Sequence, residues 1–151
     1  MKKPLFMSLC FAGLLLAACE DQSDKPYLKI LGGGFVFNYR YSAMNYGFVA
    51  KPLRSLPAGA TLEASFEVPG SDQPYVTTLP VQDGKMQYAF ETEPLHDVKK
   101  DIPYKARLRL LEASTGKELA SLEQEFRSTV SQNVLPTRAP VKGSWYFPNP
   151  D

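Results

Sequence analysis

Cysteine and histidine are scarce in this chain, which has two Cys and one His among 151 residues. The cysteines are Cys10 and Cys19, so no thiol follows residue 19 to form a disulfide, a nucleophile or a metal ligand. The one histidine, His96, cannot complete a His/Cys zinc set, and no G-x-S-x-G motif presents a serine for a catalytic triad. The hydrophobic core must therefore hold the fold.

Two further kinds of site are missing. Met44, Met86 and His96 are side chains that copper accepts, but they form no clustered motif, so we expect no metal and no cofactor. The glycine run at residues 32–34 lacks the Lys-Ser/Thr pair and the following helix that a phosphate loop requires. A β-bulge or hinge is the simpler interpretation of these glycines.

An excess of charge of either sign is also absent. The chain has 17 Lys and Arg against 16 Asp and Glu, for a formal net charge of +1. This balance gives no electrostatic basis for a nucleic-acid partner, and we expect none. Aromatic residues make up 12% of the chain and 13 residues are proline, a composition that favours strands joined by turns over a helical bundle.

The N-terminus contains the most specific motif. Two lysines at positions 2 and 3 precede an apolar run over residues 5–16, which is shorter than the roughly 20 residues of a membrane-spanning helix but typical of a signal peptide. The run ends in the sequence LAAC, residues 16–19. This sequence resembles the lipobox of bacterial lipoproteins. The resemblance implies cleavage before Cys19, which would then carry diacylglycerol on its sulfur and an acyl chain, such as palmitate, on its amine.

The lipoprotein resemblance predicts where the protein lies and how it is divided. Residues 1–18 would be the signal peptide, residues 19–26 a short lipidated tether, residues 27–129 one domain and residues 130–151 a C-terminal tail. Cleavage leaves 133 residues with 15 basic and 16 acidic side chains, a net charge of −1. Glu20, rather than Asp, follows the cysteine, so we expect the periplasmic face of the outer membrane, with the outer leaflet of the inner membrane as the alternative.

An aromatic segment at residues 35–48 follows the glycines. Large side chains alternate with small or polar ones from Phe35 to Tyr41, and the alternation then changes phase so that residues 44, 46 and 48 are bulky. This period of two predicts two strands, or one strand with a bulge. The segment is either the core stripe of a sheet or an exposed binding face. The candidate binding residues are Tyr39, Tyr41, Tyr46 and Phe48.

Two hairpins are predicted further along the chain. Residues 75–81 and 86–90 flank Asp83-Gly84, a strong two-residue turn signal, with Leu79 facing Tyr88. Residues 104–111 and 118–127 flank a three-residue turn at 114–116, in a register that places Arg107 opposite Glu123. The second of these strands also fits a helical stripe, because Leu119, Leu122 and Phe126 are spaced at i, i+3 and i+7. Pro80 predicts an edge strand.

The last twenty residues are rich in proline and contain Trp145 and Tyr146, followed by Phe147. These aromatic side chains either pack back on the domain or form a docking peptide. Packing back is the simpler interpretation, because an exposed aromatic triplet promotes aggregation. Trp145 and Tyr146 are therefore secondary candidates for binding.

Together these patterns predict an all-β fold: a single antiparallel two-sheet sandwich of seven or eight strands, loosely similar to immunoglobulin and fibronectin domains. That architecture implies no function by itself. We expect a membrane-anchored, non-enzymatic binding or assembly module for an envelope protein or peptidoglycan. The alternative is a small glycan or lipid hydrolase, which would need carboxylates such as Glu91, Glu93 and Asp97 gathered in one cleft.

Overall fold

Segments with alternating apolar and polar side chains form seven β-strands in residues 24–141, the part of the chain that the computed structural model describes, and a short 3₁₀ helix follows the last strand. The elements are β1 Leu28–Asn38, β2 Ala43–Pro52, β3 Thr61–Phe66, β4 Tyr75–Pro80, β5 Tyr88–Glu91, β6 Pro103–Leu111, β7 Glu118–Arg127 and η2 Gln132–Val134. Within these residues no helix has the length and apolarity needed to cross a membrane.

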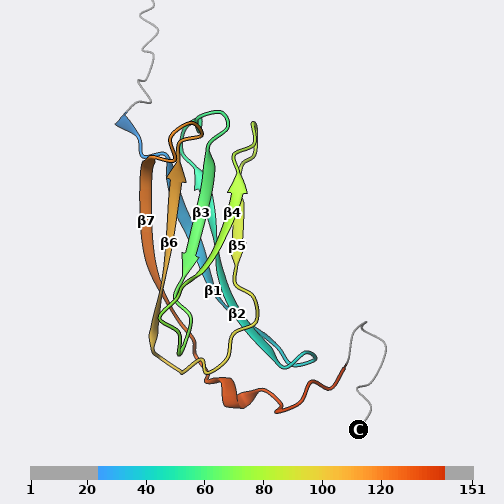
Figure 1. The fold of residues 1–151 in the computed structure, drawn as a ribbon. Helices are drawn as coiled ribbons and strands as arrows, with labels where there is room; N and C mark the ends of the chain where they lie inside the picture. The colour runs from blue at the N-terminus through green and yellow to red at the C-terminus, as the bar shows by residue number, and fades with distance from the viewer. Residues whose placement is uncertain (1–23, 142–151) are drawn as a thin grey trace, which may run out of the picture.

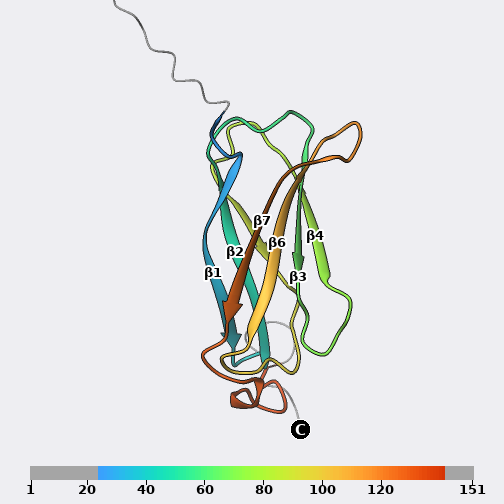
Figure 2. The ribbon, with the colours of Figure 1, turned by 90° about the vertical axis from the view of Figure 1, so that its left-hand side faces the viewer.

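The strands form two antiparallel sheets packed face to face (Figures 1 and 2). One sheet has three strands in the order β1-β2-β5, and the other has four in the order β4-β3-β6-β7. The predicted all-β, two-sheet sandwich is therefore confirmed.

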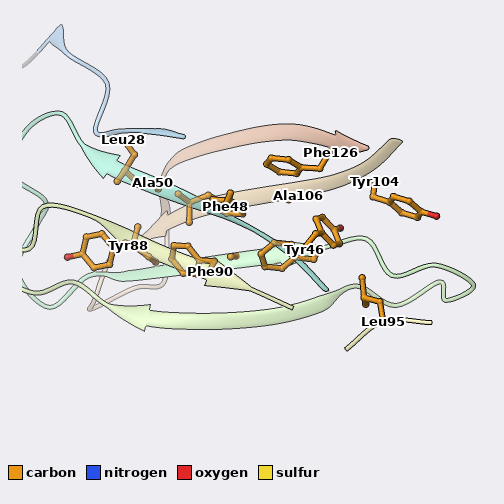
Figure 3. Packing of buried hydrophobic residues seen from close by; sticks show 14 of the residues in the cluster. Leu28, Tyr46, Phe48, Ala50, Tyr88, Phe90, Leu95, Tyr104, Ala106 and Phe126 are labelled. Atoms are coloured by element: carbon orange, nitrogen blue, oxygen red, sulfur yellow. The ribbon is translucent and has the colours of Figure 1, made fainter. Parts of the chain in front are cut away.

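The core lies between the sheets and is rich in aromatic rings (Figure 3). On β2 the residues at even positions face inward, and on β3 Leu62, Ala64 and Phe66 do so, each fully buried. Phe35 stacks on Tyr46 with 4.8 Å between ring centroids, and Tyr46 meets Phe66 edge to face at 5.2 Å. The period-two pattern thus predicted which side chains share a face, and for β2 the structure selects the core stripe over the exposed binding face.

The predicted hairpin between residues 75–81 and 86–90 is wrong. β4 pairs with β3, whereas β5 pairs with β2 in the opposite sheet. A turn does form at the expected place: the N–H of Lys85 donates to the carbonyl of Gln82 at 3.3 Å, and Gly84 has φ +70°. A type I′ turn also needs a positive φ at Asp83, which this residue does not adopt. The turn therefore leads the chain from one sheet to the other.

The hairpin of β6 and β7 is confirmed, and the helical alternative for residues 118–127 is wrong. Arg107 lies opposite Glu123, as the register predicted. The ion pairs run between neighbouring positions: Arg107 Nη2 lies 3.1 Å from Glu118 Oε2, and Lys105 Nζ lies 3.7 Å from Glu123 Oε1. These pairs are exposed on the outer face of the sheet and contribute little to stability.

The glycine run lies within β1, and a β-bulge precedes it, because the pairing with β2 shifts between Ile30 and Gly32. The predicted bulge is confirmed. Pro80 ends β4, which forms one edge of the four-stranded sheet, as expected for a strand that cannot donate every ladder hydrogen bond.

The sandwich has two ends with different loops (Figure 1). The proximal end, where the described chain begins, contains the connections 53–60, 81–87 and 112–117. The distal end contains the β1–β2 turn at 39–42, the connections 67–74 and 92–102, and the segment 128–141. β1 runs from the proximal to the distal end over its eleven residues, which corresponds to about 35 Å.

Candidate functional site

Three segments that are far apart in the sequence meet at the distal end: the β1–β2 turn, the connection 92–102 and the segment 128–141. Their contacts are backbone hydrogen bonds. The N–H of Gln132 donates to the carbonyl of Val98 at 2.8 Å, and the N–H of Val141 donates to the carbonyl of Arg40 at 3.2 Å. These bonds attach the segment 128–141 both to the loop and to the turn.

Side chains add to this attachment. The hydroxyl of Ser42 donates to the carbonyl of Pro136, and the hydroxyl of Ser131 accepts the N–H of Lys100 at 2.9 Å. The hydroxyl of Tyr104, at the start of β6, accepts the N–H of Lys99 at 2.9 Å. The distal end is therefore an ordered surface, because polar contacts hold its segments together.

A cavity of about 690 Å³ opens between the three segments. Its floor includes the buried side chains of Val98 and Leu135. Nine polar or aromatic residues also line it: Tyr41, Ser42, His96, Asp97, Lys99, Ser131, Gln132, Asn133 and Thr137. Aromatic rings, hydroxyls, amides and charges of both signs are groups that bind polar ligands such as sugars or peptides.

The backbone at this end is locally strained. Ser42, Asp97 and Asp101 have φ of +50°, +61° and +60°, and they are the residues other than glycine with positive φ among residues 24–141. Such conformations cost free energy and collect at functional sites. All three lie at the distal end, two of them in the cavity lining.

Exposed apolar side chains also gather here. Tyr39 and Tyr41 project from the β1–β2 turn with 57% and 39% of their surface exposed, and Ile102 and Val134 are exposed as well. The side chain of Asn38 accepts the N–H of Tyr41 at 3.3 Å, which orders the turn. Tyrosines held on an ordered turn are typical of binding surfaces.

Tyr46 and Phe48 are core residues, with 0% and 2% of their surface exposed, which corrects the prediction that they contact a partner. Both point from β2 into the space between the sheets (Figure 3). The Tyr46 hydroxyl satisfies its polarity internally by donating to the carbonyl of Glu67 at 2.7 Å. Burial raises the pKa of Tyr46 well above its usual range.

The carboxylates needed by a hydrolase are not gathered in the cavity. Asp97 lines it, whereas Glu91 lies on the outer face of β5, where it accepts a hydrogen bond from the side chain of Asn45. Glu93 is exposed and is not part of the lining. Glycoside hydrolysis usually needs two facing carboxyl groups, and the described lining has one.

The described residues contain no group of three or more His, Cys, Asp or Glu side chains that could hold a metal ion. The copper candidates are also separated. Met44 is buried at the distal start of β2, near His96, while Met86 lies in the proximal connection 81–87.

Some candidates lie outside the described residues, namely Cys19, Trp145 and Tyr146. The structure adds lining residues that sequence reasoning missed, among them Ser42, Lys99 and Gln132. No motif marked them, because they come from three segments that only the fold brings together.

No protein-family model matches this chain, and no curated protein matches it. Among solved structures, the chain is similar to a provisionally assigned beta-galactosidase from Bacteroides fragilis, at 16% identity and a TM-score of 0.40. The match covers 64% of this chain and 16% of that protein, so the chain spans a small part of its length. Similarity at this level assigns neither a family nor an activity.

Proposed function

We propose that this chain is a lipid-anchored envelope protein whose β-sandwich is a non-enzymatic binding or assembly module for a protein or a cell-wall glycan. Cys19 would carry the anchor. Several acyl chains on one residue give stable attachment without a membrane-spanning helix. The periplasmic face of the outer membrane is the proposed location, with the outer leaflet of the inner membrane as the alternative.

The observation that carries this proposal is that the start of the described chain and the candidate binding surface lie at opposite ends of the sandwich. The described chain begins at the end of the sandwich opposite the β1–β2 turn (Figure 1). Tyr39 and Tyr41 belong to that turn, and the 690 Å³ cavity lies beside it at the distal end. A short tether would hold the proximal end near the bilayer. The distal surface would then face away from the membrane, about 35 Å further out.

The distal surface has the features of a recognition site. It combines exposed tyrosines, an ordered turn and a cavity lined by polar side chains. Tyrosine supplies a large apolar contact area and one polar group, at a low cost in conformational entropy. The single carboxylate in the described lining, Asp97, favours binding over the hydrolase alternative.

Site-specific photo-crosslinking in the native cell tests the proposal. A photoreactive amino acid would replace Tyr39 or Tyr41 in turn, with Val76 on β4 as an exposed control away from the turn. We expect a discrete adduct with a protein or a glycan at the tyrosine positions and none at Val76. Equal labelling at all three positions, or no adduct in a folded and anchored protein, would contradict the proposal.

A further inference from the structure

A second cavity, of about 610 Å³, lies at the proximal end. It opens between the connection that follows β2 and the connection between β4 and β5, so both sheets contribute to it. Its apolar lining includes Leu53, Leu56, Val81 and Met86. Met86 has 67% of its surface exposed, although it is a large apolar side chain at the rim of a cavity.

Two cations line the same cavity, and each lies over an aromatic ring. The guanidinium carbon of Arg54 is 3.6 Å from the centroid of the Tyr27 ring, and Lys85 Nζ is 5.0 Å from the centroid of the Tyr88 ring. These contacts limit the positions that the two charged groups adopt. Asp83 is the carboxylate in the described lining, so the lining has a net charge of +1.

The cavity adjoins the point where the described chain begins. The N–H of Leu53 donates to the carbonyl of Tyr27 at 2.9 Å, and Arg54 also lines a smaller hollow beside Asp24 and Lys25. Cys19 precedes Asp24 by five residues, and five residues span at most about 18 Å. With Cys19 in the bilayer, the cavity therefore lies at or near the layer of lipid headgroups.

We propose that the proximal cavity binds one anionic phospholipid of the bilayer, with Arg54 and Lys85 at its phosphate and Met86 against its upper acyl chain. This inference rests on the proposed lipid anchor for its geometry. The charges select the occupant: the acyl groups on Cys19 itself are uncharged, whereas an anionic headgroup complements two ring-held cations. The site would fix the orientation of the sandwich on the membrane, which attachment at Cys19 alone does not.

The full-length lipidated protein in nanodiscs provides the test, with a photoreactive amino acid in place of Met86. The nanodiscs contain phosphatidylcholine and a minor share of phosphatidylglycerol, and intact mass identifies the lipid in each adduct. We expect phosphatidylglycerol adducts enriched at least about fivefold over its share of the bilayer, because each cation near an anionic headgroup contributes a factor of about five.

A double substitution, Arg54→Gln with Lys85→Gln, should return the adducts to the bulk lipid composition. The matched control is Lys29→Gln with Lys51→Gln, which removes two cations from facing positions at the same end of β1 and β2, outside the cavity lining. This control should keep the enrichment.

Adducts in bulk proportion in the wild-type protein, adducts on the lipid of Cys19, or adducts with a protein would each overturn the proposed site. An unacylated protein would overturn the anchor as well. Crosslinking at Tyr39 and Tyr41 reports on the distal surface alone, so the failure of one proposal is distinguishable from failure of the other.

Discussion

Gly33 of β1 packs directly on Gly47 of β2: a Cβ built on Gly33 would lie 2.2 Å from the carbonyl oxygen of Gly47 and 2.8 Å from the ring of Phe126. No side chain fits there without moving the backbone of β2. The neighbouring Gly34, which pairs with Gly47 in the ladder, has open space at the same position.

Gly33→Ala should therefore lower the free energy of unfolding by about 2–3 kcal/mol, since overpacking against backbone is not relieved by a rotamer change. Gly34→Ala is the matched control and should change it by less than about 0.5 kcal/mol. Chemical denaturation of both variants measures the difference. Equal stabilities would show that β1 does not approach β2 as closely as described.

Alkaline stability should depend on Tyr46. The unfolded chain ionises this tyrosine near its ordinary pKa of about 10, whereas burial raises the pKa of Tyr46 in the folded state. Above pH 10 the unfolded state thus loses a proton that the folded state keeps, so the free energy of unfolding falls as the pH rises, by up to about 1.4 kcal/mol per pH unit.

Tyr46→Phe should make this fall less steep between pH 10 and pH 11, a range set by the ordinary tyrosine pKa. Denaturation curves collected across that range provide the slopes. Tyr39→Phe removes an exposed hydroxyl instead and should retain the wild-type slope. The same slope in the wild type and in Tyr46→Phe would contradict a raised pKa of Tyr46 in the folded state.

Asp97 should be sensitive to backbone conformation rather than to the loss of its charge. Its φ of +61° disfavours a residue with a Cβ and no local hydrogen-bonding group, so Asp97→Ala should cost about 1 kcal/mol of stability. Asp97→Gly should cost nothing or stabilise slightly, because glycine adopts this conformation freely. Thermal unfolding of the two variants and the wild type measures these differences. A glycine variant less stable than the wild type would contradict a strained backbone at Asp97.

Cys19→Ala should leave an uncleaved, unlipidated precursor. Labelling cells with a palmitate analogue and measuring the mass of the purified protein would detect the change. Normal acylation of this variant would remove the basis for the proposed anchor and location.

The sequence predicted the strands and their inward faces well, because burying one face of a strand places apolar residues at every second position, a pattern that a short stretch of sequence shows. The bulge before Gly32, the edge position of Pro80 and the register of Arg107 against Glu123 followed from equally local chemistry. Strand partners were harder to predict. The Asp83-Gly84 turn has the residues of a tight hairpin, yet only the glycine adopts a positive φ, and the chain crosses to the other sheet.

The candidate site was predicted only in part for a related reason. Tyr39 and Tyr41 stood out as aromatic residues, and both are exposed. Tyr46 follows the change of phase on β2, a pattern that fits a core stripe or a binding face, and the packing of Phe66 and Phe35 against its ring shows that this face is core. Gln132 and Lys99 line the cavity because the segment 128–141 returns to the β1–β2 turn, which no short sequence window shows.

The crossing of the chain at residues 81–87 also determines the order in which the domain can fold. Asn38 pairs with Ala43 across one turn, which is a local contact. Ala50 pairs with Tyr88 and Thr61 pairs with Leu111, which are far apart in the sequence, so each sheet needs strands from both halves of the chain. Such non-local pairing slows folding to milliseconds or seconds. The β1–β2 ribbon is local, whereas its aromatic side is covered by Phe66 of β3, Tyr104 of β6 and Phe126 of β7, which come later in the chain. We expect the chain to be most prone to aggregation before these strands pack on the ribbon.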